Sequence, residues 1–86
     1  MPRALTISRT RVPPEHRDAA IGRMRARHGH YAAARCNHWV FEDARLPGDF
    51  TEFAEAPDAA TLAAAHASAP DAVPGGSHLL HEVVLT

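Results

Sequence analysis

Three residues in this chain are our candidates for proton transfer at neutral pH, namely His38, His66 and Glu52. Imidazole titrates near neutral pH, so a histidine that borders a bound molecule can act as a general acid or base. If residues 34–43 and 49–56 pair as neighbouring strands, Glu52 lies close to His38 and can orient its ring. The alternative is structural: His66 would be a histidine at the core edge, and His38 a polar side chain on a half-buried strand.

Aromatic side chains close to these groups suit a flat ligand. Trp39, Phe41 and Phe53 can together form an aromatic wall. Aromatic residues also dominate the core of a small domain, so the alternative is that these three only pack. We predict Trp39 and Phe53 as ligand walls, with His38 or Glu52 as polar anchors.

Other kinds of site have little support. The seven histidines form no HExxH pattern and no tight cluster with cysteine, so we predict no metal. There is no Gly-x-Ser-x-Gly elbow, and Cys36 has no activating motif beside it. The glycine pair Gly75-Gly76 matches no recognisable ligand-binding loop, and we expect no cofactor.

Apolar periodicity and turn residues place six elements along the chain. Residues 4–12 alternate as a strand, which Pro13-Pro14 stops. A helix then runs to about His28, with Gly29 as its natural C-terminal stop. The remaining predicted segments are strands at 34–43 and 49–56, a helix over about 59–68, a loop at 70–78 and a strand at 79–86. This βαββαβ order predicts the ferredoxin-like α+β fold, a four-stranded antiparallel sheet with two helices on one face.

The helix over about 59–68 would present His66. Asp58 is a good N-cap, because its carboxylate can accept a hydrogen bond from a free N–H of the first turn. Leu62 and His66 lie four residues apart and share one helical face. Before them, Pro47-Gly48 opens a turn in which glycine accepts an unusual φ angle.

The last predicted strand, 79–86, implies a partner. Leu79, Val83 and Leu85 point to one side of it, and Leu80 and Val84 to the other. A strand that is apolar on both faces is usually buried on both. Two helices cover only one face of a sheet, so a second copy of the sheet is the simplest cover for the other, and we predict a homodimer.

Charge is distributed unevenly along the chain, although the net charge is only −1. Up to Arg35 there are eight arginines and two acidic residues, and from Cys36 onward one arginine and eight acidic residues. Such a split can mark a nucleic-acid site, but a nearly neutral domain gains little attraction to phosphate. We predict that the two halves pair with each other instead. In the first helix, Ala20, Ile21, Met24 and His28 would form the apolar stripe, with the arginines mostly on other faces.

Size and hydropathy indicate a single domain, residues 1–86. No segment approaches the ~20 apolar residues that span a bilayer, and the N-terminus lacks the apolar segment of a signal peptide. A lone cysteine fits a reducing compartment. We therefore expect a soluble, cytoplasmic protein without a membrane partner.

The stretch 47–66 resembles a known family. A Pro-Gly turn, a strand with Phe50 and Phe53, and a short capped helix with His66 are similar to the dimeric α+β barrel superfamily, and within it to the antibiotic-biosynthesis-monooxygenase-like domains. The resemblance covers nearly the whole chain in length and element order. Where relatives commonly have a tryptophan at the end of the third strand, this chain has Ala56.

The resemblance implies a homodimer with a cavity between the sheet and helices of each subunit. It also implies a small apolar or aromatic ligand and, in some members, oxidation of polycyclic phenols by O₂ without a cofactor. His66 and His38 would be catalytic, and Trp39, Phe53, Phe50, Asn37 and Glu52 would bind the ligand. Other members degrade haem with Asn, Trp and His, of which only the histidine is matched by position. A non-catalytic binding domain and a small-ring isomerase or lyase are the alternatives.

Overall fold

The protein is described by a computed structural model over residues 2–70 and 77–85. Neighbouring strands are all antiparallel, in the order β2-β3-β1-β4. The elements follow the predicted order and confirm the ferredoxin-like α+β fold: β1 (Ala4–Arg11), a short 3-10 helix η1 (Pro14–His16), α1 (Arg17–Ala33), β2 (Asn37–Glu42), β3 (Asp49–Ala56), α2 (Ala59–Ala67) and β4 (His78–His81).

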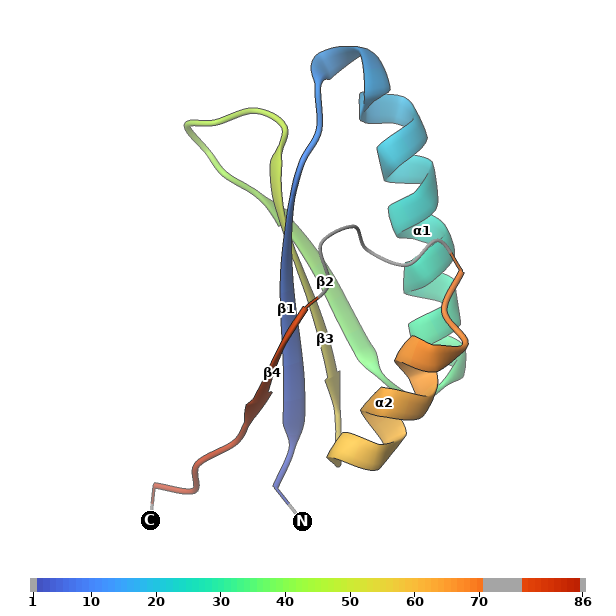
Figure 1. Ribbon diagram of the computed structural model, residues 1–86, viewed down its shortest axis with the longest axis vertical. Helices are drawn as coiled ribbons and strands as arrows, with labels where there is room; N and C mark the ends of the chain where they lie inside the picture. Colours follow the sequence, from blue (N-terminus) through green and yellow to red (C-terminus); the bar gives the residue numbers. More distant parts are fainter. Residues whose placement is uncertain (1, 71–76, 86) are drawn as a thin grey trace.

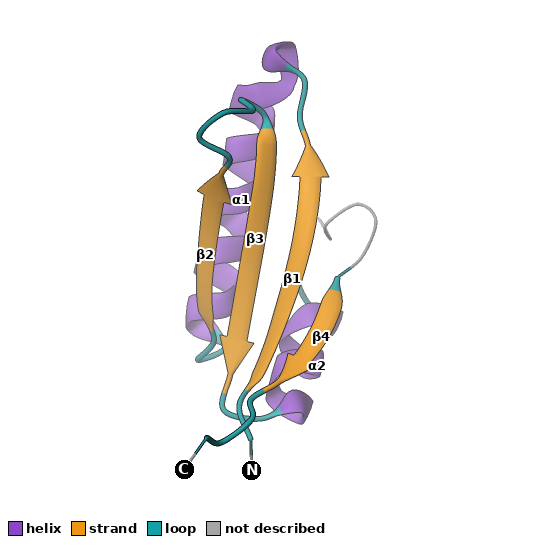
Figure 2. Cartoon of the chain, turned by 90° about the vertical axis from the view of Figure 1, so that its left-hand side faces the viewer, coloured by secondary structure: helices purple, strands orange, loops and turns teal. Residues whose placement is uncertain are grey.

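The molecule has two layers. Both helices lie against one face of the sheet (Figure 1). No element of the described residues covers the opposite face, which we call the outer face (Figure 2). Strand β3 shows the predicted alternation most clearly. Phe50, Glu52 and Ala54 are buried toward the helices, whereas Thr51 and Phe53 are half-buried on the outer face.

Two apolar clusters fill the space between sheet and helices, with polar side chains between them along the strands. One cluster contains Tyr31, Cys36 and Leu62 among several alanines, and the other contains Val12, Ala20, Met24 and Phe50. Between the clusters lies a set of buried polar residues that we call the polar belt: Thr6, Ser8, Arg27, His38 and Glu52. Across the described part of the chain, every buried side-chain nitrogen and oxygen has a hydrogen-bond partner.

Helix α1 differs from its prediction at the C-terminus. It passes through Gly29 and ends at Ala33, because its buried face continues beyond the glycine. The buried residues are Ala20, Met24, Arg27 and Tyr31, spaced by three or four residues as on one helical face. The predicted stripe is therefore wrong in two places: Arg27 and Tyr31 are buried, and His28 is exposed.

The strands at either end of the sheet are shorter than predicted. Strand β2 covers residues 37–42 instead of 34–43, because the end of α1 and its cap occupy residues 34–36. Strand β4 covers 78–81 instead of 79–86, and its side chains are exposed, not buried on both faces. Residues 82–85 are not in a strand, and most of the predicted 70–78 loop and residue 86 lie outside the described residues.

The segment that carries His66 forms as predicted. The Asp58 carboxylate accepts a hydrogen bond from the Thr61 N–H (2.7 Å), which confirms it as the N-cap of α2. Leu62 and His66 share the face toward the sheet and α1. Gly48 has a φ of 92°, and a side chain there would clash with the carbonyl oxygen of Val12, so this turn requires glycine.

Ion pairs connect the basic and acidic halves of the chain, as the charge pattern predicted. Each of the four Arg–acid pairs described joins an arginine before residue 35 to an acid after residue 36. The pairs are Arg3–Glu55, Arg9–Asp49, Arg17–Glu42 and Arg27–Glu52.

Candidate functional site

The buried Arg27–Glu52 ion pair lies in the middle of the polar belt. Arg27 Nε donates to Glu52 Oε2 (2.7 Å) and Arg27 Nη2 donates to Glu52 Oε1 (2.8 Å), a two-point contact that fixes the carboxylate plane. Both side chains are less than one-tenth exposed. Burial favours the neutral acid, but hydrogen bonds from His38 and Arg27 outweigh it and hold the pKa of Glu52 at about 2.

His38 lies next to this pair, as the sequence predicted. Its Nε2 is 2.8 Å from Glu52 Oε2, because β2 and β3 pair with Val40 opposite Glu52 and His38 opposite Ala54. The His38 ring stacks on the Tyr31 ring, with centroids 5.2 Å apart and planes 14° apart. On its other side, His38 Nδ1 is 3.0 Å from Nδ1 of His28 on α1.

His66 has a protein partner on each of its ring nitrogens. Its Nε2 is 2.8 Å from the Thr6 hydroxyl, and its Nδ1 is 2.7 Å from the Tyr31 hydroxyl. Burial lowers the pKa of His66 and raises the pKa of Tyr31, so both are neutral at pH 7. The Thr6 hydroxyl donates to the Ala54 carbonyl oxygen (3.4 Å), which favours hydrogen on His66 Nε2, donated to the Thr6 oxygen. His66 Nδ1 then has a lone pair, which accepts a hydrogen bond from the Tyr31 hydroxyl.

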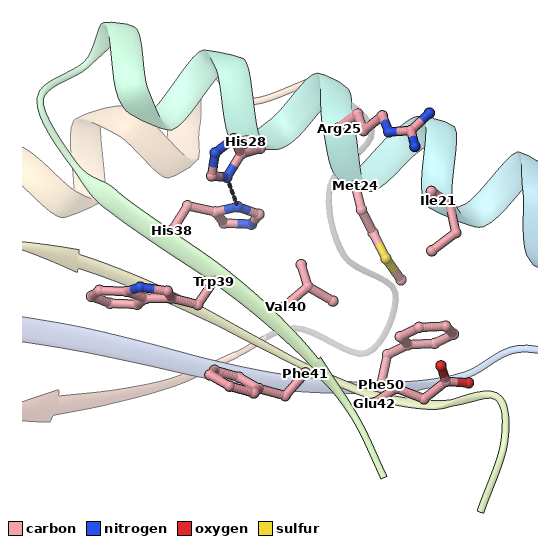
Figure 3. Close-up of a pocket in the computed structure, with 10 residues that line it drawn as sticks. All are labelled: Ile21, Met24, Arg25, His28, His38, Trp39, Val40, Phe41, Glu42 and Phe50. Atoms are coloured by element: carbon pink, nitrogen blue, oxygen red, sulfur yellow. Dashed lines mark hydrogen bonds between the residues drawn. The ribbon is translucent and has the colours of Figure 1, made fainter. Parts of the chain in front are cut away.

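An open groove of about 590 Å³ lies between α1 and β2, and we call it the α1–β2 groove. His28 and His38 lie at one end of it, and Met24 and Phe50 at the other (Figure 3). Its volume is within the usual range for small-molecule sites. It is mostly apolar, and its lining residues are Ile21, Met24, Arg25, His28, His38, Trp39, Val40, Phe41, Glu42 and Phe50.

The predicted site residues lie in three places: at the α1–β2 groove, beside Tyr31, and on the outer face. His38, Trp39 and Phe50 line the α1–β2 groove, and Glu52 supports His38 from below its surface. His66 lies outside the groove lining, against Tyr31.

The predicted aromatic wall forms on the outer face, on the opposite side of the sheet from His66. Trp39 pairs with Phe53 across the strands, and Phe41 meets Phe53 edge-on with centroids 5.6 Å apart. Trp39 and Phe41 point away from α1 and only border the groove (Figure 3). Asn37 shares this face and donates to Glu55 Oε1 (2.9 Å).

The predicted site leaves out four residues that are hydrogen-bonded to His38, Glu52 or His66, namely Thr6, Arg27, His28 and Tyr31. A helix that ends at Gly29, as predicted, excludes Tyr31 from the site. The predicted apolar stripe includes His28, which in the structure is exposed at the edge of the groove. The spacing of Ala20, Met24, Arg27 and Tyr31, by three or four residues, is the signal in the sequence for a helix that continues past Gly29.

The described ranges, 2–70 and 77–85, contain no group of three or more His, Cys, Asp or Glu side chains placed to hold a metal ion. They also contain no helix long and apolar enough to cross a membrane.

Comparisons with known proteins bear on the fold alone. No family model matches the chain, and no curated protein sequence matches it. The structure is similar to the solved structure of Rv0793 from Mycobacterium tuberculosis, with a TM-score of 0.64 and 16% sequence identity. The match covers 100% of this chain and 97% of that one. The two proteins share their fold over the whole chain.

Proposed function

We propose that this protein is a small-molecule-binding domain of the antibiotic-biosynthesis-monooxygenase-like kind. Its ligand is a flat, largely apolar, aromatic molecule that lies in the α1–β2 groove. The observation that carries the proposal is the make-up of this groove: apolar walls from both elements, with the imidazoles of His28 and His38 at one end. Few polar groups in an apolar cleft are typical of ligand sites, where they fix orientation.

The roles of the predicted residues follow from their positions. Phe50 contacts the ligand, and Trp39 borders the groove from the outer face. His38, supported by Glu52, holds His28 at the polar end of the site. His66 holds the Tyr31 ring in place beside His38, since its two nitrogens already have partners.

A second candidate is cofactor-independent monooxygenation of a polyketide-type phenol in the same groove, favoured by the two imidazoles there. A histidine takes the phenolic proton, and O₂ adds to a ring carbon of the phenolate. Loss of water then gives a quinone, so that one oxygen atom stays in the product and the other leaves as water. The substrate itself supplies the electrons. Consumption of O₂ with quinone formation supports this reaction, whereas binding without turnover supports a binding domain, and turnover without O₂ supports an isomerase or lyase.

The homodimer belongs to the same proposal. The outer face carries a band of large apolar side chains that a second copy of the sheet would bury. Trp39, Phe41 and Leu80 are each more than two-fifths exposed. In the sheet register, Phe53 lies between Trp39 and Ile7 on this face, and Leu5 lies beside Leu80.

Filling the groove tests the binding proposal. Ile21→Trp places a large side chain in the lining of the groove, and Arg23→Trp places the same side chain on an exposed position of α1 outside that lining. We expect naphthalene-type aromatic compounds, titrated by fluorescence, to bind the native protein and the Arg23 variant, with at least about tenfold weaker binding to the Ile21 variant. Equal binding to all three proteins would contradict the groove as the site.

A further inference from the structure

A chain of hydrogen bonds leads from the protein interior to the end of the α1–β2 groove. It runs from Arg27 through Glu52 and His38 to His28, with successive distances of 2.7, 2.8 and 3.0 Å. The side chains of Arg27, Glu52 and His38 are 6%, 7% and 1% exposed. His28, the last residue in this series of hydrogen bonds, is exposed and lines the groove.

The carboxylate of Glu52 determines where the proton of His38 lies. An ionised carboxylate only accepts hydrogen bonds, so His38 Nε2 carries the hydrogen. Neutral His38 then has its lone pair at Nδ1. Because this atom faces Nδ1 of His28, His28 must donate from Nδ1.

The consequence for His28 is a lone pair at Nε2. Within the described residues this nitrogen has no hydrogen-bond partner in the protein, unlike both nitrogens of His66. A proton that arrives at His28 Nε2 leaves the bond to His38 intact, because Nδ1 keeps its hydrogen. Two hydrogens between the two Nδ1 atoms, which are 3.0 Å apart, would repel each other, so only one hydrogen lies between them.

We propose that His28 Nε2 is the proton-accepting atom of the α1–β2 groove, held in that state by His38, Glu52 and Arg27. It selects aromatic ligands that carry a phenolic or enolic O–H, which donates to Nε2. This ligand class rests on the proposed function, because it requires that the groove binds aromatic molecules. His38, Glu52 and Arg27 act through His28 and are positioning residues.

The state of His28 is tested on the protein without a ligand. Nitrogen-15 NMR at about pH 8, where an ordinary histidine is neutral, reports which ring nitrogen carries hydrogen. We expect His38 to be protonated at Nε2 and His28 at Nδ1. The His38→Phe variant keeps a flat ring against Tyr31 but has no atom that accepts a hydrogen bond from His28 Nδ1. We expect His28 in this variant to lose the form with hydrogen on Nδ1. A native protein with hydrogen at Nε2 of His28 overturns the proposal, and this measurement needs no variant to fold.

The ligand class is tested with a matched pair of compounds, 2-naphthol and 2-methoxynaphthalene, which differ in the O–H. We expect the native protein to prefer 2-naphthol by about tenfold. His28→Ala removes this preference and keeps binding of the methoxy compound. His16→Ala, an exposed histidine outside the groove lining, keeps the preference.

The outcomes separate the two proposals. Equal binding of both compounds to the native protein overturns the selection of O–H groups by His28 and leaves the groove as a binding site. Binding of neither compound overturns the proposed function and the ligand class together. The NMR measurement decides the proton-accepting state of His28 in either case.

Discussion

At the residue scale, the defining feature is a polar network placed where a small domain normally has apolar packing. A buried charge pair adds stability only when its geometry is good and its remaining hydrogen-bonding atoms are satisfied. Glu52 meets this condition, because it accepts two hydrogen bonds from Arg27 and one from His38. The sequence predicted the His38–Glu52 contact from strand pairing. It did not predict that Arg27 is buried, because its charge suggested a solvated helix face.

Removing the charge of Glu52 should therefore be costly. We expect Glu52→Gln to lower the free energy of unfolding by about 3–5 kcal/mol, because it breaks the buried Arg27–Glu52 ion pair by removing one of its two charges. Glu55→Gln makes the same chemical change in a pair whose arginine, Arg3, is 59% exposed, and should cost only about 0–1 kcal/mol. Urea unfolding of the two variants measures both values, and similar losses would contradict the special role of the buried pair.

His66 should make stability depend on pH in the mildly acidic range. Burial lowers the pKa of His66 below its ordinary value of 6.5, so the folded protein favours the neutral ring. The stabilisation is complete above about pH 6.5 and is lost as the pH falls from there to the lower folded pKa. His66→Gln should lack this slope in thermal unfolding. Glu52 acts in a separate window, because its stabilisation is lost only as the pH falls from 4.5 toward 2.

At the element scale, the end of α1 decides which residues reach the site. The helix closes with a Schellman motif, in which the Cys36 N–H donates to the Tyr31 carbonyl (2.8 Å) and the Arg35 N–H to the Ala32 carbonyl (3.1 Å). Arg35 takes the left-handed position, with a φ of 62°. This position is usually glycine, so the glycine at 29 was a misleading stop signal.

Replacing Arg35 with glycine should stabilise the protein. A left-handed conformation costs a non-glycine residue about 1 kcal/mol or more, and part of the gain is offset by the greater freedom of glycine in the unfolded chain. We expect Arg35→Gly to raise the free energy of unfolding by about 0.5–1 kcal/mol. Ala32→Gly, inside the last turn of α1, should lower it by about 1 kcal/mol. Denaturant unfolding of both variants checks the opposite signs.

At the scale of the whole molecule, the open outer face is the feature that a single chain leaves unexplained. Its apolar side chains extend over β2, β3 and β1 to Leu80 of β4. Exposed apolar patches of this kind commonly mark an interface. Strand β4 begins the segment whose apolar pattern predicted a partner, and its side chains are exposed in the single chain.

A charge on this face should prevent dimer formation. Phe53 lies in the aromatic cluster of the outer face, and burying a new carboxylate there would cost several kcal/mol. We expect the native protein to be a dimer by light scattering at micromolar concentration and Phe53→Glu to be a folded monomer. Ala26→Glu, on the exposed side of α1, should remain dimeric. A monomeric native protein would contradict the proposed homodimer.

The sequence by itself determined the element order, the ferredoxin-like fold, the cap of α2 and the alternation that places His38 next to Glu52. These features depend on turn residues, on the two-residue period of strands and on contacts between neighbouring strands, which local patterns specify. The tertiary structure decided that His28 contacts His38, that the Tyr31 hydroxyl is hydrogen-bonded to His66, and that Trp39 and Phe53 lie on the outer face. Such contacts depend on how α1 is rotated about its axis over the sheet and on which sheet face the helices cover. Neither quantity follows from the spacing of residues within one element.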